Sequence, residues 1–522
     1  MPFSRKIDKF VHHFWAVASV PGRQESPRFS RPIVASGLPR RNKTAPVAFN
    51  NHVKTLDGIM KNILLLVALA ALLTACIEDN FSTSTTDVLE FSTDSVKFDT
   101  VITAQSTPTK QFVVYNRGKK QLRISSIKMA GRSDKGHFYL NVDGVKGTEF
   151  HDVEVRGNDS IYVFVESYLD EMRQDAPVEI SDLIEFETNG VKQQVVAHAW
   201  GQDVVRLHGD TIGRSVHFTA DKPYLIYDTL FVARGATLTL DAGATLLFHD
   251  KGAMRVAGRL VANGTQERPV VLRGDRLDHV VGTINFDIMS GQWGGVIFTP
   301  PTRLNELHHV TMSGSTIGMH VSAADTLTRA LYLHNCVLHN ASTSVFTSGG
   351  AWVDAVGTEF SDAAESVVNF IGGKVNLVQC TLANYYLFKA PTDPIIFVYL
   401  QDDDHVVDEL KARFDNCVIY GNTSEINMGD LTGTDVMLRY CLLKSAGDDD
   451  ANFISCVWQG DPKFYTEREK YIFDYRLHDE SDAIGRGNPA LCPASARYDR
   501  YGQDRLASGG VDLGAYTWIP EN

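Results

Sequence analysis

The sequence lacks any apolar stretch long enough to cross a bilayer. Its most apolar run, from Ile63 to Ala75, has 13 residues, whereas a transmembrane helix needs about 20. Basic residues are also in the minority, with 50 Lys and Arg against 63 Asp and Glu. Proline is scarce, at 18 residues beside 41 glycines. This balance fits a turn-rich β protein.

The basic residues are concentrated at the beginning of the chain. Residues 1–59 carry ten Lys or Arg and three acids, and they show no sustained hydrophobic period. At Met60 a new pattern begins, with a short basic stretch, the apolar run and then small residues, which is the pattern of a secretory signal. We therefore expect residues 60–75 to be a signal peptide. Residues 1–59 are then an upstream extension outside the working protein, from a start codon assigned too early.

The end of this signal, Leu73-Thr74-Ala75-Cys76, resembles a bacterial lipobox. The resemblance implies that Cys76 becomes the lipidated first residue of the mature chain. The acidic pair Glu78-Asp79 resembles the surface-export signal of Bacteroidetes-type lipoproteins, with a solvated linker as the alternative. Together these resemblances imply a protein of the outer membrane that is exposed at the cell surface. Residues 76–88 would be the lipidated cysteine and a flexible tether.

The chain that begins at Cys76 is strongly acidic. The first 75 residues hold 11 of the basic side chains and three of the acidic ones, so 39 basic and 60 acidic side chains remain, a formal net charge of −21. Such a charge repels nucleic acid and anionic lipid headgroups. Nucleic acid is therefore not an expected partner, and attachment to the membrane would depend on acyl chains alone.

Residues 89–203 carry alternating patterns typical of short strands. Apolar residues recur at alternate positions in runs such as 112–115 and 161–165, and turns such as Asn189-Gly190 separate the runs. This spacing predicts an immunoglobulin-like β-sandwich. The segment, with a strand that ends in the Asn-x-Gly turn Asn116-Arg117-Gly118, also resembles the Ig-like domains of large surface and ciliary proteins. We expect it to be a spacer; glycan binding is the alternative, although no residue is singled out for it.

From residue 229 onward the strands become much shorter. Each alternates for about four residues and ends at a Gly or Asn turn, which leaves no room for a crossover helix. A short phrase then recurs, and we align its positions as Val310, Cys336, Glu359, Cys380, Cys417 and Cys441, in steps of 26, 23, 21, 37 and 24 residues. Steps of this size predict a right-handed parallel β-helix over residues 204–460.

The aligned cysteines have a structural explanation. A row of small apolar side chains packs well inside a coil, and free cysteine is among the most buried residues. We expect a buried ladder rather than a metal site, because no His or Cys shares the spacing. The pairing of Cys456 with Cys492 stays open.

Two phrases resemble known β-helix proteins. The segment Gln292-Trp293-Gly294-Gly295-Val296 is similar to right-handed β-helix lipoproteins of the pectate-lyase-like superfamily, and Trp293 is expected to be structural, with sugar stacking as the alternative. Near the end, Asp512-Leu513-Gly514-Ala515-Tyr516 resembles the choice-of-anchor segment of surface β-helix proteins. We expect residues 461–522 to cap the open end of the coil.

Candidate chemistry is sparse. The run Asp402-Asp403-Asp404 lies in a long insertion and would bind calcium or flank a cleft, with a solvated loop as the alternative. Otherwise no cofactor or metal is expected. His308 and His309 are adjacent in a strand and should point to opposite faces. A solvated outer face is the default expectation for four arginines that could instead line one face near an anionic glycan: Arg255, Arg259, Arg273 and Arg276.

Two functions follow from this pattern. The first is a non-catalytic surface lipoprotein whose β-helix binds glycan or a protein partner. The second, implied by the resemblance to the pectate-lyase-like superfamily, is a polysaccharide lyase or glycoside hydrolase. The repeated coils contain no Asn-Thr-Asp or Arg-x-Lys phrase, so no catalytic residue is assigned and the first function is preferred.

Overall fold

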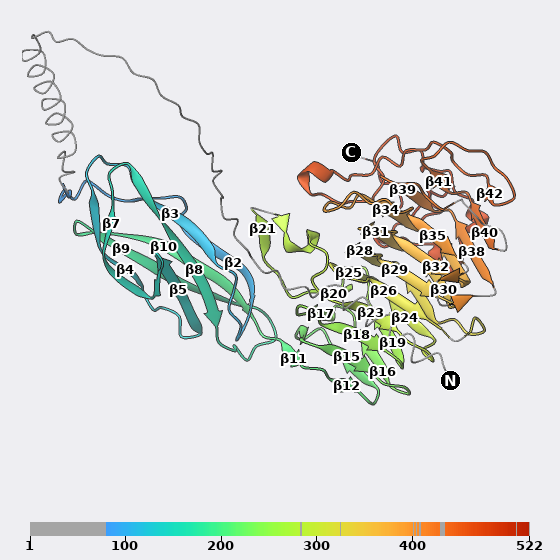
Figure 1. Cartoon of the computed structure of the whole chain (residues 1–522), viewed down its shortest axis with the longest axis horizontal. Helices are drawn as coiled ribbons and strands as arrows, with labels where there is room; N and C mark the ends of the chain where they lie inside the picture. The colour runs from blue at the N-terminus through green and yellow to red at the C-terminus, as the bar shows by residue number, and fades with distance from the viewer. Residues whose placement is uncertain are drawn as a thin grey trace, which may run out of the picture. The chain divides into compact units, whose positions relative to one another are not determined.

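The structure is a computed structural model that describes residues 80–522 apart from 282–283, 324, 400, 403–404, 407–408, 428–433, 508 and 521–522. The described residues belong to one compact unit that begins at Asp79 (Figure 1). The predicted upstream extension, the signal peptide and Cys76 lie outside them. Of the helices that are described, none is long and apolar enough to cross a membrane.

The first part of the described chain is a β-sandwich, as predicted. Sandwich sheet 1 has the order β1 (Glu90–Phe91), β3 (Lys110–Asn116), β8 (Asp159–Leu169), β5 (Gly136–Val142) and β6 (Val145–Gly147). Sandwich sheet 2 has the order β2 (Ser95–Ile102), β10 (Val191–Gln202), β9 (Val178–Thr188), β4 (Leu122–Met129) and β7 (Glu149–Val155). Neighbouring strands are antiparallel except for the parallel pair β2 and β10.

Alternation along the strands builds the sandwich core. In β8, Val163 and Val165 are fully buried. Tyr162, which precedes them, and Phe164, which lies between them, are exposed. Because successive side chains of a strand point to opposite faces, this pattern buries one face of each sheet against the other. Phe112 and Phe186, which come from different sheets, meet edge to face in the core with ring centroids 6.2 Å apart.

The second part is the predicted parallel β-helix, in which three sheets run along one coil (Figure 1). Coil sheet 1 consists of β11 (Val205–Leu207), β14 (Tyr224–Ile226), β17 (Thr245–Phe248), β20 (Val270–Gly274), β25 (Val310–Ser313), β28 (Val337–Ala341), β31 (Glu359–Ala363), β34 (Thr381–Asn384), β39 (Val418–Gly421) and β41 (Leu442–Leu443). Coil sheet 2 consists of β12 (Thr211–Ile212), β15 (Thr229–Val232), β18 (Ala253–Val256), β23 (Gly295–Phe298), β26 (Met319–Ser322), β29 (Phe346–Gly349), β32 (Val368–Ile371) and β35 (Ile396–Tyr399). Coil sheet 3 consists of β13 (Val216–Phe218), β16 (Thr237–Leu240), β19 (Arg259–Asn263), β24 (Asn305–His308), β27 (Leu331–His334), β30 (Trp352–Val356), β33 (Gly373–Val378), β38 (Leu410–Asp415), β40 (Asp435–Arg439) and β42 (Phe453–Ile454).

The register of coil sheet 1 corrects one aligned position. Val337 pairs with Glu359, and Glu359 pairs with Thr381. The residue that aligns with Cys336 and Cys380 is therefore Thr358, which is fully buried, and not Glu359. A shift of one residue moves a side chain to the other face of a sheet, so Glu359 points out of the coil.

The cysteines form the predicted ladder inside the coil. Each of the four is buried, and each thiol donates to a backbone carbonyl of the preceding turn: Cys336 to Leu307, Cys380 to Ala355, Cys417 to Leu377 and Cys441 to Phe414. Cys456 and Cys492 are free thiols in separate surroundings.

The C-terminal residues cover a flank of the coil and not only its end. This segment contains η2 (Arg468–Lys470), η3 (Pro489–Leu491) and η4 (Ala494–Ala496). Arg500 donates to Thr311 in β25, and Asn416, just before β39, donates to the carbonyl of Asn488. The segment therefore crosses the outer face of coil sheet 1 from β25 to β39, whereas the sequence predicted a cap over the end.

Two excursions leave the coil. After β20 the chain forms the two-stranded sheet of β21 (His279–Val281) and β22 (Ile284–Asn285), followed by η1 (Phe286–Ile288). After β35 it forms the two-stranded sheet of β36 (Gln401–Asp402) and β37 (His405–Val406). The first excursion contacts coil sheet 1, where Asn340 of β28 donates to the carbonyl of Asp287, and the chain re-enters the coil at β23 of coil sheet 2.

Candidate functional site

The sequence-predicted calcium residues are only partly described. Asp402 lies at the end of β36, and Asp403 and Asp404 lie outside the described residues. Within the described part of the chain, no group of three or more His, Cys, Asp or Glu side chains is placed to hold a metal ion. Calcium binding at Asp402–Asp404 thus stays a prediction, as does lipidation of Cys76.

Trp293 is a structural residue. Its ring is fully buried and stacks on Phe248 with centroids 4.1 Å apart and an interplanar angle of 9°. Its indole N–H donates to the carbonyl of Ser313 at 2.8 Å. A buried ring whose polar atom is satisfied has no face left for a sugar, so the stacking alternative is wrong.

The four arginines do not share one face. Arg255 lies in β18 of coil sheet 2, Arg259 in β19 of coil sheet 3, and Arg273 in β20 of coil sheet 1. Arg259 pairs with Glu306 at 3.4 Å, and Arg273 pairs with Asp287 at 2.5 Å. The three sheets face different directions, so this set cannot line a single anion-binding surface.

His308 and His309 also differ from the expectation of opposite faces. The backbone of His309 has a φ of 46°, which ends β24 and turns the side chain. Both rings lie beside His334, at centroid distances of 5.3 and 5.9 Å. Burial lowers the pKa of all three imidazoles, and burial followed by the charge of Arg500 lowers the pKa of His309 to about 4. The cluster is therefore uncharged at neutral pH.

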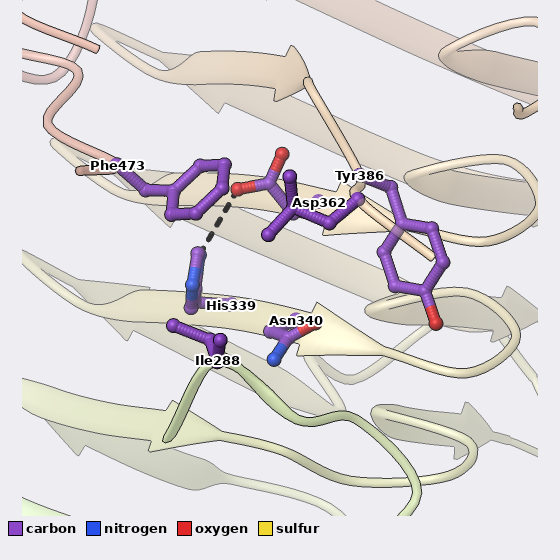
Figure 2. A pocket seen from close by; sticks show the side chains of 7 residues that line it. Ile288, His339, Asn340, Asp362, Tyr386 and Phe473 are labelled. Atoms are coloured by element: carbon purple, nitrogen blue, oxygen red, sulfur yellow. Dashed lines mark ion pairs between the residues drawn. The ribbon is translucent and has the colours of Figure 1, made fainter. Parts of the chain in front are cut away.

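A small pocket lies over coil sheet 1, between the first excursion and the C-terminal segment (Figure 2). Figure 2 shows His339 pointing toward Asp362, with Phe473 beside the pair; the imidazole Nδ1 and the carboxylate are 3.4 Å apart. The empty space of the pocket, open solvent included, is about 200 Å³, which is already less than the ~300 Å³ at which small-molecule sites begin. The pocket is too small to enclose a sugar chain.

The carboxylates beneath this region hold the C-terminal segment. Asp362 accepts from the Tyr475 hydroxyl at 2.6 Å and from the Tyr385 backbone N–H at 2.7 Å. Glu359 accepts from the hydroxyls of Tyr516 and Ser361. Burial raises the pKa of Glu359, and it raises the pKa of Asp362 to about 7. Both acids are buried, and both accept hydrogen bonds from tyrosine hydroxyls of the C-terminal segment.

The outer face of coil sheet 3 carries a different arrangement, centred on Asp354. We call it the Asp354 cluster and define it as Arg329, Tyr332, Trp352, Asp354, Lys374 and Asn376. Its members come from β27, β30, β33 and the loop before β27. Parallel register sets Tyr332 beside Asp354 and Asp354 beside Asn376, so the row crosses three successive turns.

Asp354 is the common acceptor of this cluster. Its carboxylate accepts from the Trp352 indole at 2.8 Å, from the Asn376 carboxamide at 2.7 Å and from the Arg329 guanidinium at 3.1 Å. These bonds fix the side chains while they remain partly open to solvent, with the Arg329 and Asp354 side chains 31% and 20% exposed.

Cations and rings alternate on the cluster. The Lys374 ammonium lies 3.9 Å from the centroid of the Trp352 ring, and the Arg329 guanidinium lies 4.5 Å from that of Tyr332. With Lys374 and Arg329 against Asp354, the cluster carries a surplus positive charge on an acidic protein. Aromatic rings, donors and a cation held in fixed positions are suited to binding a polar polymer such as a polysaccharide.

Sequence reasoning did not find the Asp354 cluster. Its residues come from successive turns, about 20 residues apart in the sequence, and no recurring sequence motif connects them. Alternation along the strands could have identified these outward positions, because the aligned repeats place β30 next to β33. The outward residues of these two strands are Trp352, Asp354, Lys374 and Asn376.

No protein-family model matches the chain, and no curated protein matches it.

Proposed function

We propose that this protein is a non-catalytic, surface-anchored polysaccharide-binding protein whose coil binds its ligand at the Asp354 cluster. The observation that carries the proposal is the triple hydrogen bonding of Asp354, which holds Arg329, Trp352 and Asn376 in place without ligand. Side chains fixed in advance lose little conformational entropy on binding. The surplus cation favours a glycan that carries carboxylates.

The test uses residues 77–522, which contain the whole described unit. Binding of polygalacturonate is measured by affinity electrophoresis, beside neutral glucans and at two salt concentrations. Trp352→Ala and Lys374→Ala are each expected to weaken binding by about tenfold, the equivalent of ~1.4 kcal/mol. Phe388→Ala removes a ring that is 49% exposed elsewhere on the coil and serves as the matched control.

The salt dependence of binding and the class of ligand that binds distinguish the possible outcomes. Binding through Lys374 should weaken as salt screens the charge. If neither acidic nor neutral glycans bind the unsubstituted protein, the proposal is wrong. Retention of a specific protein through the same face, lost in Trp352→Ala, would instead assign the cluster to a protein partner.

The alternative function is a polysaccharide lyase or hydrolase, and one observation favours it. Asp362 has a pKa raised to about 7 by burial and lines the pocket beside His339, and a carboxyl near neutrality suits a general acid or base. Incubation with polygalacturonate, with and without calcium, would reveal unsaturated or reducing ends. Product formation that Asp362→Asn abolishes would establish this function in place of the first.

The cellular setting is a proposal as well. Lipid attachment at Cys76 would place the protein in the outer membrane, and the acidic pair after it supports exposure at the cell surface. Cys76→Ala should abolish incorporation of a labelled fatty acid, and protease treatment of intact cells should remove the protein. A protein that survives this treatment faces the periplasm, which would contradict surface exposure.

A further inference from the structure

A second surface with exposed rings lies on the sandwich, away from the Asp354 cluster. Three aromatic side chains of β8 point outward from sandwich sheet 1: Tyr162, Phe164 and Tyr168 are 52%, 37% and 37% exposed. β8 is the central strand of that sheet, between β3 and β5. Large apolar rings that are exposed next to one another on a sheet are typical of an interaction site.

Polar side chains flank the middle ring. Phe164 pairs with Gln111 on β3 and with Asn141 on β5. Neighbouring strands lie about 4.8 Å apart, so a carboxamide stands on each side of the ring. We call Gln111, Asn141, Tyr162, Phe164 and Tyr168 the sandwich platform.

One atom of the sandwich platform points to a missing partner. The carboxamide oxygen of Asn141 is buried and accepts no hydrogen bond from the described residues. Leaving a buried acceptor unsatisfied costs about 1–3 kcal/mol, and such groups are rare enough in folded proteins to need an explanation. A ligand hydroxyl beside Phe164 would supply the donor once the carboxamide of Asn141 turns toward it.

The charge of the face narrows the choice of ligand. Glu166, the outward residue between Phe164 and Tyr168, pairs with Lys146 at 2.5 Å, and the hydrogen bond from Lys146 lowers the pKa of Glu166 despite partial burial. The pair leaves no surplus charge beside the rings. Because this face lacks the surplus cation of the Asp354 cluster and the protein as a whole is acidic, a polyanion is disfavoured here.

We propose that the sandwich platform binds a neutral polysaccharide chain. The face of one pyranose ring stacks on Phe164, and its hydroxyls on either side donate to and accept from Asn141 and Gln111. Tyr162 and Tyr168 carry the adjoining sugars on each side along β8. This site does not depend on the Asp354 cluster, and it assigns to the sandwich a role beyond that of a spacer.

The experiment measures retention of residues 77–522 in gels that contain laminarin, hydroxyethylcellulose or galactomannan. Phe164→Ala is expected to weaken retention about tenfold and Asn141→Ala about fivefold on the glycan that binds. Trp200→Ala is the matched control, because Trp200 is a ring of similar exposure, 41%, on the other sheet of the sandwich. It should change retention by less than about twofold.

The outcomes separate this proposal from the one for the coil. Trp352→Ala should retain full binding of the neutral glycan. If Trp352→Ala loses that binding and Phe164→Ala keeps it, the neutral site belongs to the coil and the inference about the sandwich is wrong. It is also wrong if none of the three glycans retards the unsubstituted protein. A dimer that Phe164→Ala converts to a monomer, without glycan binding, would make this face a contact between copies instead.

Folding must be checked in each variant. The substituted side chains lie on the solvent side of β8 and β5, so the melting temperatures are expected to stay within about 3 °C of the unsubstituted protein. Lost retention in a variant that melts normally is then a loss of binding.

Discussion

The hydroxyl of Tyr516 donates a hydrogen bond to the buried carboxylate of Glu359, although 157 positions separate the two residues. Tyr475 does the same for Asp362, three residues further along β31. Two acids on one strand thus hold the C-terminal segment at two points. The segment buries both carboxylates and supplies each with a hydroxyl donor, so it belongs to the folded coil.

The first prediction concerns this attachment. Tyr475→Phe removes the hydroxyl that Asp362 accepts from, and an acceptor left short of a donor in a buried site costs about 1–3 kcal/mol. The variant should unfold at lower urea concentration, and limited proteolysis should cut residues 461–522 sooner. Tyr471→Phe, at a residue 44% exposed in the same segment, is the control. Equal behaviour of the two variants would show that the hydroxyl contributes nothing.

The second prediction is a pH dependence of stability. Burial raises the pKa of Asp362 to about 7, whereas an aspartate in an unfolded chain has a pKa of about 3.9. Between these values the folded protein keeps a proton that the unfolded chain has lost, so the free energy of unfolding falls as pH rises from about 4 to about 7. Asp362→Asn should flatten this slope in urea titrations at about pH 5 and about pH 8.

Two other groups near Asp362 also titrate, and they change the free energy of unfolding with pH in opposite directions. The raised pKa of Glu359 acts in the same direction. The pKa of His339 is lowered by burial, so its contribution to stability is lost as pH falls below about 6.5. Both groups remain in Asp362→Asn, so the difference between the two profiles reports Asp362 together with its electrostatic coupling to Glu359 and His339. Parallel profiles would mean that Asp362 ionises normally.

The third prediction tests the close stacking of the coil. Gly318 has a φ of +62°, and a Cβ there would lie 2.2 Å from the carbonyl oxygen of Val345 on the next turn. Gly318→Ala should therefore destabilise the protein by ~3 kcal/mol or more. Gly213→Ala is the control, since a Cβ there meets nothing within 4 Å. Soluble yield and melting temperature report the effect, and a normal Gly318→Ala protein would contradict the stacking.

The fourth prediction concerns the cysteine ladder. Burial raises the pKa of Cys336 to about 11 and raises that of Cys417 as well, and only the thiolate reacts with alkylating agents. Iodoacetamide at about pH 8 should leave the four ladder cysteines unmodified in the folded protein and modify them in urea. Cys492, which is partly exposed, should react first. Peptide mass spectrometry identifies the sites, and early labelling of Cys417 would show that the coil opens there.

The sequence predicted the architecture because alternation and turn residues repeat. The short strands from Leu230 onward and the spacing of the cysteines define a coil whose inside and outside follow from period 2. Glu359 was misaligned by one residue because a polar side chain gives no sign of which face it occupies. The pairing of Glu359 with Val337 in the structure shows that Glu359 lies on the outer face of the sheet.

The candidate sites escaped sequence reasoning for a related reason. Trp352, Lys374 and Asp354 are neighbours through stacking of turns, and Phe164 meets Gln111 and Asn141 through pairing of strands distant in the chain. A single sequence reveals outward positions but not which of them meet. The path of the C-terminal segment along coil sheet 1 was equally hidden, since it depends on individual hydrogen bonds such as that of Tyr475.

The position of the C-terminal segment also imposes an order on assembly. β31 is synthesised more than a hundred residues before Tyr475 and Tyr516, so the turns can stack while the acids of β31 still face water. The flank closes only when the last part of the chain arrives. A chain that stops short of Tyr475 would contain all the stacked turns but leave the outer face of coil sheet 1 uncovered.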